Sequence, residues 1–296
     1  MATVQDLKRR IRSIRNTSKI TKAMELVASA RLRRAQARIE AMRPFADRML
    51  ELMVGTARAS ASVRGLPLLQ RRDVQSVAIV PLTGDRGLAG AFNAQILRYS
   101  FTLERRLRAE GKDVRWLVAG KKGRSTLRFR RYAVEQAWIG FSDRPSYSDA
   151  QAIAHRVSEL YSNGDVDQVI VVYNHFESAL VQRVVEQELL PIPEQLLEQS
   201  EEEERREALL GDFIYEPEPE EILERLLPVY VETELYRALL ESAASEQGAR
   251  MTAMRNASKN AGDLIGTLTL AMNRARQAEI TQEILEVVAG ADALTA

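Results

Sequence analysis

The fold is decided by the stretch LIGTLTLAMNRARQAEITQEIL, which occupies residues 264–285. Its apolar or small positions alternate between steps of four and three residues, the spacing of a helix that supercoils against another helix. These positions are Leu264, Leu268, Ala271, Ala275, Ala278, Gln282 and Leu285. Because most of them are alanines, we expect the partner helix to lie close along this seam.

The helix that carries this seam is long. Residues 229–289 contain hardly a helix breaker, and about 60 residues at about 1.5 Å each make a rod of roughly 90 Å. Charged side chains flank the seam, which indicates a solvated outer face. Pro228 lies just inside the periodic region, where it predicts a kink or a break of the helix.

The other end of the chain offers a matching helix over residues 3–57. Its apolar stripes recur in the same steps of three and four. The stripes are Val4, Leu7, Ile11 and Ile14, and then Met24, Ala28, Leu32, Ala35, Ile39 and Met42. Pro44 is the one breaker and predicts a bend or an interruption. We therefore expect the two ends of the chain to form an antiparallel pair.

The middle of the chain follows a different pattern. Short apolar runs at 77–82, 114–119, 166–173 and 178–185 predict strands, the last two paired around residues 174–177. Helices are expected at 91–110, after Gly123, and at 148–161, where Ser148 and Gln151 have the spacing of a capping box. Alternating strands and helices indicate a mainly parallel sheet covered by helices.

The predicted fold is therefore a long antiparallel coiled coil of the N- and C-terminal helices plus a Rossmann-like α/β domain. The expected division is residues 1–60 for the first coiled-coil helix and 72–195 for the α/β domain. An acidic loop and foot follow at 196–218, and the second coiled-coil helix occupies 219–296.

Composition excludes several classes of site. The chain of 296 residues has no cysteine and two histidines, so thiolate chemistry is excluded and a histidine metal site nearly so. No apolar run approaches a membrane span, and we expect no leader peptide. Charge is segregated: residues 1–58 hold 14 basic and 5 acidic side chains, and residues 186–234 hold 3 basic and 17 acidic ones. Such blocks indicate surfaces for different partners.

No motif predicts catalysis or a bound cofactor. Gly84, Gly87 and Gly90 follow the first strand but lack the spacing of a dinucleotide fingerprint, so a structural turn is the favoured interpretation. His155 is expected on the surface and His175 in a turn. With no triad and no carboxylate pair, we predict no catalytic, cofactor-binding or metal-binding residue, and a nucleotide-dependent enzyme is the least favoured class.

Two charged stretches leave alternatives open. The basic helix at 1–58 could bind nucleic acid or a membrane surface, although its cations lie on several faces and aromatic residues are lacking. A coiled-coil nucleic-acid-binding protein is therefore the runner-up. The acidic run at 201–204 is either a solvated loop or a surface for a partner.

Five stretches go beyond a generic coiled coil. Near the ends they are ITKAMELVA at 20–28 and ARQAEITQEI at 275–284, and between them TGDRGLAGAFN at 83–93, YEP at 215–217 and ASEQGARM at 244–251. Together they resemble the gamma subunit of F-type ATP synthases, in the right order over essentially the whole chain.

The resemblance implies a non-catalytic central rotor. Its coiled coil stands inside a ring of three alpha and three beta subunits. Its α/β domain lies below that ring, beside the epsilon subunit, and its foot rests on the ring of c subunits. Proton flow turns the shaft, which drives the catalytic sites of beta in sequence through different states. No nucleic acid partner is implied.

The resemblance also implies which residues make contacts. Met24 and Arg250 would lie at the collar near an acidic loop of beta. Arg276, Gln277, Thr281 and Glu283 would contact beta higher up, and Tyr215 and Glu216 would lie near the c ring. A peripheral position on the cytoplasmic side of a bacterial cell membrane is the expected location.

Overall fold

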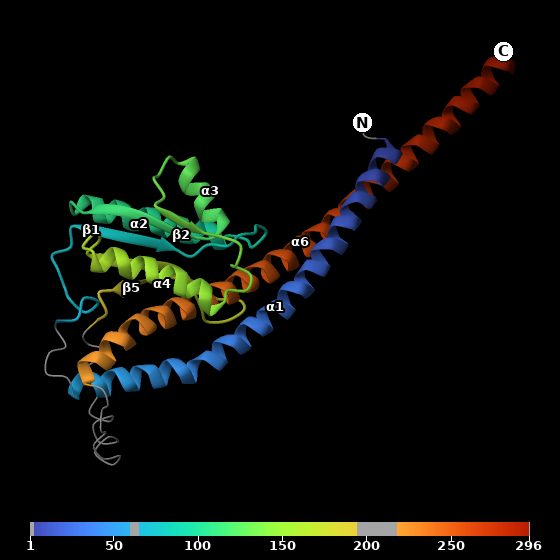
Figure 1. Cartoon of the computed structure of the whole chain (residues 1–296). Helices are drawn as coiled ribbons and strands as arrows, with labels where there is room; N and C mark the ends of the chain where they lie inside the picture. The colour runs from blue at the N-terminus through green and yellow to red at the C-terminus, as the bar shows by residue number, and fades with distance from the viewer. Residues whose placement is uncertain (1–2, 60–64, 194–217, 296) are drawn as a thin grey trace. The chain divides into compact units, whose positions relative to one another are not determined.

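The computed structural model describes residues 3–59, 65–193 and 218–295, with the backbone alone at 58–59 and 291–295. The chain divides into two compact units, Met1–Ala28 with Arg250–Ala296, and Ser29–Ala249. Two long helices contribute to both units: α1 is Val4–Ala59 and α6 is Pro219–Thr295 (Figure 1).

In the first unit, the start of α1 pairs with the later part of α6. The Thr21 hydroxyl lies 2.7 Å from the Ser258 hydroxyl, and the Arg255 guanidinium donates to the Glu25 carboxylate at 3.0 Å. Residue numbers rise along one helix as they fall along the other, so the pair is antiparallel, as predicted. The buried apolar side chains of this unit are Leu7, Ile11, Ala28, Met251, Met254 and Ala261.

The seam predicted on α6 is wrong in part. Leu264 is 47% exposed and Leu285 is 62% exposed, whereas Ala261 is buried and Met272 half-buried. The contact therefore runs along the row of Ala261, Ile265, Leu268, Met272 and Ala275, and Ala271 lies outside it.

The helical register explains where this contact ends. The start of α1 at Val4 precedes Thr21 by about 17 residues, so Val4 falls opposite about residue 275. Residues 276–290 are all exposed, which means that Ala278 and Gln282 have no partner helix within the described part of this chain.

Neither proline breaks its helix. Pro44 lies inside α1 and Pro228 inside α6, and both helices are continuous. A proline removes one backbone hydrogen bond and destabilises a helix by about 3 kcal/mol. Around Pro228, Leu227 and Val231 are 2% and 0% exposed, so burial of the apolar face compensates for that loss. The predicted break at Pro228 is therefore wrong.

The second unit contains a five-stranded sheet of order β3-β2-β1-β4-β5. Its strands are β1 (Ser76–Pro81), β2 (Asp113–Ala119), β3 (Gln136–Trp138), β4 (Gln168–Phe176) and β5 (Gln182–Leu190). The first four run parallel, and β5 pairs antiparallel with β4. The predicted, mainly parallel sheet is confirmed, but the three-residue β3 was not foreseen.

Helices cover both faces of this sheet (Figure 1). Alternate residues of β1 point to opposite faces, so Val77 and Ile79 pack with α2 (Phe92–Ala109) and α3 (Lys121–Phe129). Ala78 and Val80 pack on the other face with α4 (Tyr147–Ser162) and with parts of α1 and α6. The parts of the two long helices that lie in this unit thus share a core with the sheet.

The boundaries of two elements differ from expectation. The turn between β4 and β5 falls at residues 177–181, so His175 lies on β4 and not in a turn. Helix α4 starts two residues early, with Ser146 as its N-cap. The Asp149 carboxylate accepts a hydrogen bond from the Ser146 amide at 2.7 Å, completing the capping box. Gln151 instead donates to the Glu232 carboxylate of α6 at 3.3 Å. His155 is exposed, as predicted.

Candidate functional site

The glycine-rich turn after β1 is organised around Asp85. Its carboxylate accepts hydrogen bonds from the backbone amides of Lys121 at 2.8 Å, Gly140 at 2.9 Å and Ser142 at 3.0 Å. Burial acts to raise the pKa of the Asp85 carboxyl group, but hydrogen bonds from Ser142, Gly140 and Lys121 outweigh burial and hold that pKa below its ordinary value. Asp85 therefore ties three loops at the carboxyl end of the sheet.

The end of β2 is pressed against the end of β1. The Thr83 hydroxyl donates to the Ala119 carbonyl at 2.8 Å and accepts from the Gly123 amide at 2.9 Å. Gly120 has a φ of 96°, and a Cβ atom there would lie 2.0 Å from the Thr83 carbonyl oxygen. Both glycines are therefore required for this close approach.

Strand order reverses between β1 and β4, the point where doubly wound sheets bind their ligands. In this chain α6 covers that point. The Ser242 hydroxyl donates to the Leu82 carbonyl at 3.3 Å, and the Ser245 hydroxyl donates to the Asn174 carbonyl at 3.0 Å. The Glu246 carboxylate lies so close to Gly84 that a Cβ atom on Gly84 would be 2.8 Å from it. We call Ser242, Ser245 and Glu246 the clamp residues of α6.

Asp143 adds a second link between distant elements of this unit. Its carboxylate accepts from Arg31 of α1 at 2.8 Å and from Gln247 of α6 at 3.1 Å. The Arg86 guanidinium of the glycine-rich turn lies 3.4 Å away. One carboxylate thus joins α1, α6 and the turn. Together with the clamp residues, this network can fasten the α/β domain to the two long helices.

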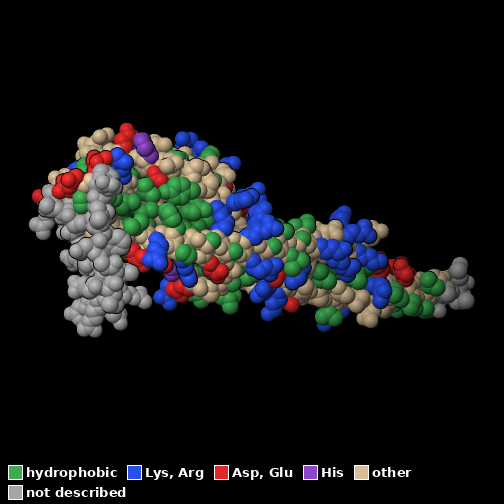
Figure 2. All heavy atoms as spheres, turned by 60° about the horizontal axis from the view of Figure 1, so that its bottom comes forward, with side chains coloured by type: hydrophobic (Ala, Val, Ile, Leu, Met, Phe, Trp, Pro, Cys, Tyr) green, Lys and Arg blue, Asp and Glu red, His purple; other side chains and the backbone are tan. Residues whose placement is uncertain are grey.

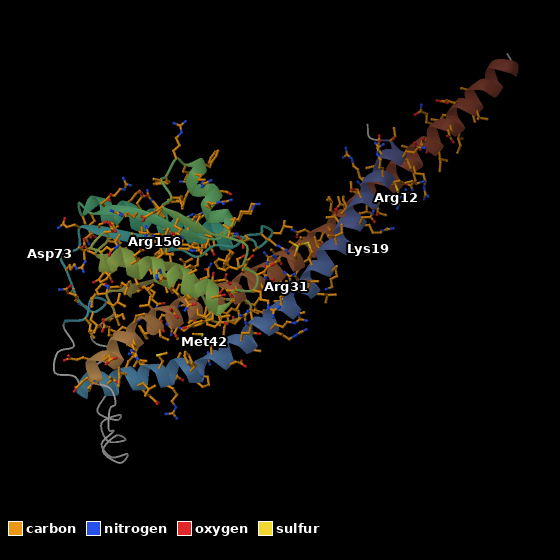
Figure 3. The ribbon with its side chains drawn as sticks, viewed as in Figure 1. Arg12, Lys19, Arg31, Met42, Asp73 and Arg156 are labelled. Carbon is orange, nitrogen blue, oxygen red and sulfur yellow. The ribbon has the colours of Figure 1, made fainter. Side chains whose placement is uncertain are left out.

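Polar groups also fix the register of the paired helices in the first unit. The Lys22 ammonium and the Arg255 guanidinium each lie 3.0 Å from the Glu25 carboxylate. Hydrogen bonds from Lys22 and then Arg255 lower the pKa of Glu25. Arg12 and Lys19 of α1 are exposed (Figure 3). Figure 2 shows that Lys and Arg side chains gather along the helical rod.

The structure places the predicted contact residues as follows. Met24 is half-buried on α1, and Arg250 is buried on α6. Arg276, Gln277, Thr281 and Glu283 are all exposed on the part of α6 beyond the start of α1. The Thr281 hydroxyl donates to the Gln277 carbonyl at 2.8 Å. Tyr215 and Glu216 lie outside the described residues.

Sequence patterns indicate only weakly the residues that organise the α/β domain. Asp143 lies in an irregular loop, where no repeating pattern exists. The clamp residues lie on α6, whose apolar pattern indicates a contact with another helix and not with the sheet. The clamp residues carry a weak signal. Ser242, Ser245 and Glu246 are polar and recur at helical spacing on one face of α6, and a polar row of this kind can mark a contact made by side chains in the core.

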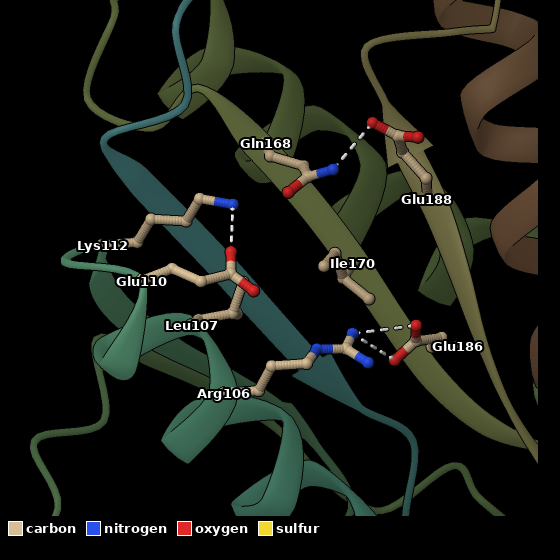
Figure 4. Close-up of a pocket in the computed structure, with 8 residues that line it drawn as sticks. All are labelled: Arg106, Leu107, Glu110, Lys112, Gln168, Ile170, Glu186 and Glu188. Carbon is tan, nitrogen blue, oxygen red and sulfur yellow. Dashed lines mark hydrogen bonds and ion pairs between the residues drawn. The ribbon is translucent and has the colours of Figure 1, made fainter.

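A hollow of about 580 Å³ lies beside α2, β4 and β5 (Figure 4). Its charged side chains bind one another. Arg106 lies 3.0 Å from Glu186, Lys112 lies 2.7 Å from Glu110, and the Gln168 amide donates to Glu188 at 2.8 Å. Such mutual pairing leaves this hollow without a charged group directed at a ligand.

Two kinds of feature are absent from the residues that the structure describes. No group of three or more His, Cys, Asp or Glu side chains could hold a metal ion in the part of the chain that the structure describes. Within those same ranges, no helix is both long and apolar enough to cross a membrane.

Comparison with known proteins covers the whole chain. A family model described as ATP synthase matches residues 3–294. The ATP synthase gamma chain of Rubrobacter xylanophilus is 46% identical over 296 residues, covering 100% of both chains. That of Moorella thermoacetica is 45% identical over 294 residues, covering 99% of this chain and 100% of the relative.

Solved structures agree with the sequence relatives. A chain in the central stalk and c-ring structure of Tetrahymena thermophila mitochondrial ATP synthase is 31% identical, with a TM-score of 0.59. The match covers 81% of this chain and 99% of that one. A chain of the Euglena gracilis mitochondrial ATP synthase rotor shares the fold, with a TM-score of 0.63 at 18% identity, covering 94% of this chain and 98% of that one. The chain therefore belongs to the family of ATP synthase gamma chains.

Proposed function

We propose that this chain is the central shaft of a proton-translocating F-type ATP synthase, which couples rotation of a ring of c subunits to conformational changes in three catalytic beta subunits. The observation that carries the proposal is the match at 46% identity over the full length of a gamma chain. The antiparallel pair formed by the two terminal helices suits such a shaft.

The exposed end of α6 supports a position inside a surrounding protein ring. Ile280, Ile284 and Val288 recur every four residues and are 48%, 57% and 51% exposed. Leu285 and Val287 beside them are 62% and 72% exposed. An aliphatic strip of this kind on a single helix is unfavourable in water and indicates a surface that other subunits cover.

The clamp residues supply a route for torque within the second unit. A force on the α/β domain reaches α6 through hydrogen bonds from Ser242 and Ser245 and through the contact between Glu246 and Gly84. A continuous helix of 77 residues then carries the rotation along its own axis. Because the shaft is asymmetric, each third of a turn presents a different face to each beta subunit.

The proposed partners are three alpha subunits, three beta subunits, the epsilon subunit and the c ring. Met24 and Arg250 are proposed to lie near an acidic loop of beta, and Arg276, Gln277, Thr281 and Glu283 to contact beta further along α6. Tyr215 and Glu216, outside the described residues, are proposed to lie near the c ring.

The chain is proposed to have no catalytic activity of its own, since ATP chemistry belongs to the beta subunits. We place it at the periphery of a bacterial cell membrane, on the cytoplasmic side. The similarity to bacterial gamma chains supports this location.

Co-expression with alpha and beta subunits of the same source tests the proposal. We expect this chain to co-purify with them and to give sustained ATP turnover, which deletion of the residues after Ala275 abolishes. The deleted variant should keep its helical circular dichroism spectrum, because residues 276–290 are exposed. Failure to co-purify or to change turnover would contradict the proposal, and salt-sensitive DNA binding by the purified chain would then favour a nucleic-acid-binding protein.

A further inference from the structure

The short helix α3 carries a concentration of positive charge that the proposed function leaves unexplained. Residues 114–134 contain seven Lys or Arg side chains and no Asp or Glu. Six of the seven form what we call the α3 basic surface, and all six are exposed or half-buried. They are Lys121, Lys122, Arg124, Arg128, Arg130 and Arg131.

These cations differ from other arginines of the same unit. Elsewhere, Arg106 lies 3.0 Å from Glu186 and Arg156 lies 2.8 Å from Glu135. Within the described residues, no member of the α3 basic surface forms an ion pair. Arg124 lies one helical turn from Arg128, a spacing at which like charges repel. Within the described residues, no ion pair offsets the repulsion between these cations.

A highly exposed aromatic residue falls within the same stretch of sequence. Phe129 is 88% exposed, more than any other large apolar side chain of the described residues. Arg128 and Arg130 flank it, and the Arg130 guanidinium lies 4.5 Å from the ring centre of Phe101 on α2. Exposed aromatic area and repelling charge are each unfavourable in water, and here they coincide.

The fold prevents α3 from turning to bury that ring. Leu127 anchors the helix and is 0% exposed. A Cβ atom on Gly123 would lie 2.6 Å from Val118 and 2.7 Å from the Thr83 hydroxyl, so the helix backbone lies directly on the sheet. Because α3 is fixed in this way, its outer side is displayed in one orientation.

We infer that the α3 basic surface and Phe129 dock an acidic segment of a neighbouring protein, in which Asp or Glu side chains surround an apolar one. Carboxylates of the partner would neutralise the cations, and its apolar group would cover the ring. A lipid surface fits less well because interfacial helices present a broad apolar face. Single-stranded nucleic acid is usually bound on several stacked aromatic rings, and this surface has one.

This inference rests on the proposed function, because the protein that carries the acidic segment is taken to be another subunit of the ATP synthase. Its test uses the complete complex, co-expressed with Phe129 replaced by p-benzoylphenylalanine, a photoreactive residue of similar shape. We expect illumination to crosslink this position to one Asp- and Glu-rich segment, identified by mass spectrometry. The same probe at Leu180, which is 72% exposed in the turn between β4 and β5, should leave that segment unlabelled.

A second arm tests the charges. The triple variant Arg124→Gln, Arg128→Gln, Arg131→Gln should lower the crosslink yield about tenfold, as the loss of a few exposed charge pairs predicts. The matched triple variant Arg71→Gln, Arg98→Gln, Arg183→Gln removes the same charge from exposed positions elsewhere in the unit and should leave the yield unchanged.

Two outcomes would overturn the inference. One is an assembly with sustained ATP turnover in which Phe129 crosslinks to no protein. The other is equal loss of yield in both triple variants. Binding of the purified chain to vesicles of phosphatidylcholine and phosphatidylglycerol, or to a short DNA duplex, with no protein crosslink, would reassign the surface to that ligand. Loss of turnover with the crosslink retained would instead remove the proposed function alone.

Discussion

A methyl group on Gly84 would lie 2.8 Å from the carboxylate of Glu246, although the two residues are 162 positions apart in the chain. Gly84 lies in the turn that follows β1 and Glu246 lies on α6, so this contact joins the α/β domain to a long helix at the point where related folds hold a ligand. In this chain, the carboxyl end of the sheet at this point contacts a helix.

Substituting Gly84 tests that attachment. We expect Gly84→Ala to lower the free energy of unfolding by about 1–3 kcal/mol, because the added methyl group overpacks the contact with Glu246. Urea unfolding followed by circular dichroism measures the change. Gly262→Ala is the control: no atom lies within 4 Å of its added methyl group, so it should stabilise α6 by about 1 kcal/mol. Equal effects of the two variants would contradict the argument.

The hydroxyl pair of the coiled coil gives a second prediction. Thr21→Val or Ser258→Ala alone should each destabilise the chain by about 1 kcal/mol, because each removes the hydrogen bond between the two hydroxyls, while the remaining hydroxyl keeps the Ser18 carbonyl as a partner. The double variant should cost less than the two single changes together, since both single changes break the same hydrogen bond. Thermal unfolding of all four proteins supplies this double-mutant cycle, and strictly additive losses would mean that the two hydroxyls do not interact.

Acid should weaken the turn that Asp85 organises. Its pKa in the folded chain is lower than the ordinary value of 3.8, so its contribution to stability is present above about pH 3.8 and is lost as pH falls through the lower, folded pKa. Asp85→Asn should destabilise the chain by about 1–3 kcal/mol at pH 7 and flatten the fall in stability at acid pH.

Urea unfolding at a series of pH values from neutral to acid measures this effect. The control is Asp113→Asn, which changes an exposed carboxyl group at the start of β2. A pH profile of Asp85→Asn that matches the unsubstituted chain would show that the carboxylate does not hold the turn.

The exposed end of α6 supplies a prediction about coupling. Replacing Arg276 and Gln277 with Ala should weaken the coupling of ATP turnover to rotation in the assembled complex and leave the helicity of the isolated chain unchanged, because both side chains are exposed. Proton pumping per ATP hydrolysed is the measurement. Replacing Lys259 and Asn260, a similar exposed pair nearer the middle of the helix, provides the comparison. Unchanged pumping would remove Arg276 and Gln277 from the proposed contacts.

Much of the fold could be predicted because repeated patterns determine it. The stripe of Leu7, Ile11 and Ala28 on α1 and the apolar runs of β1 and β4 each extend over several turns or residues, so single exceptions do not obscure them. The three residues of β3 carry no such repetition. Their place depends on pairing with β2, which no local pattern encodes.

The error in the α6 seam has a different cause. Leu264 and Ala271 form an apolar row beside Ile265 and Met272, and apolar spacing alone cannot choose between neighbouring rows. The choice is made by polar residues, since Ser258 meets Thr21 and Arg255 meets Glu25. The clamp residues and Asp143 were not predicted because, like Ser258 and Arg255, they bind partners in distant segments of the chain, which no local pattern indicates.

Because α6 is a single uninterrupted helix, the position of a residue in the sequence determines the direction of its side chain around the helix axis. Each residue turns the helix by about 100°, so one residue inserted after Glu246 would rotate every later side chain by about a quarter of a turn relative to the clamp residues. Inserting seven residues would restore the original direction to within about 20°. In a rotating shaft, the number of residues along α6 would then determine the direction in which each side chain points. The identity of a side chain would determine only what it contacts in that direction.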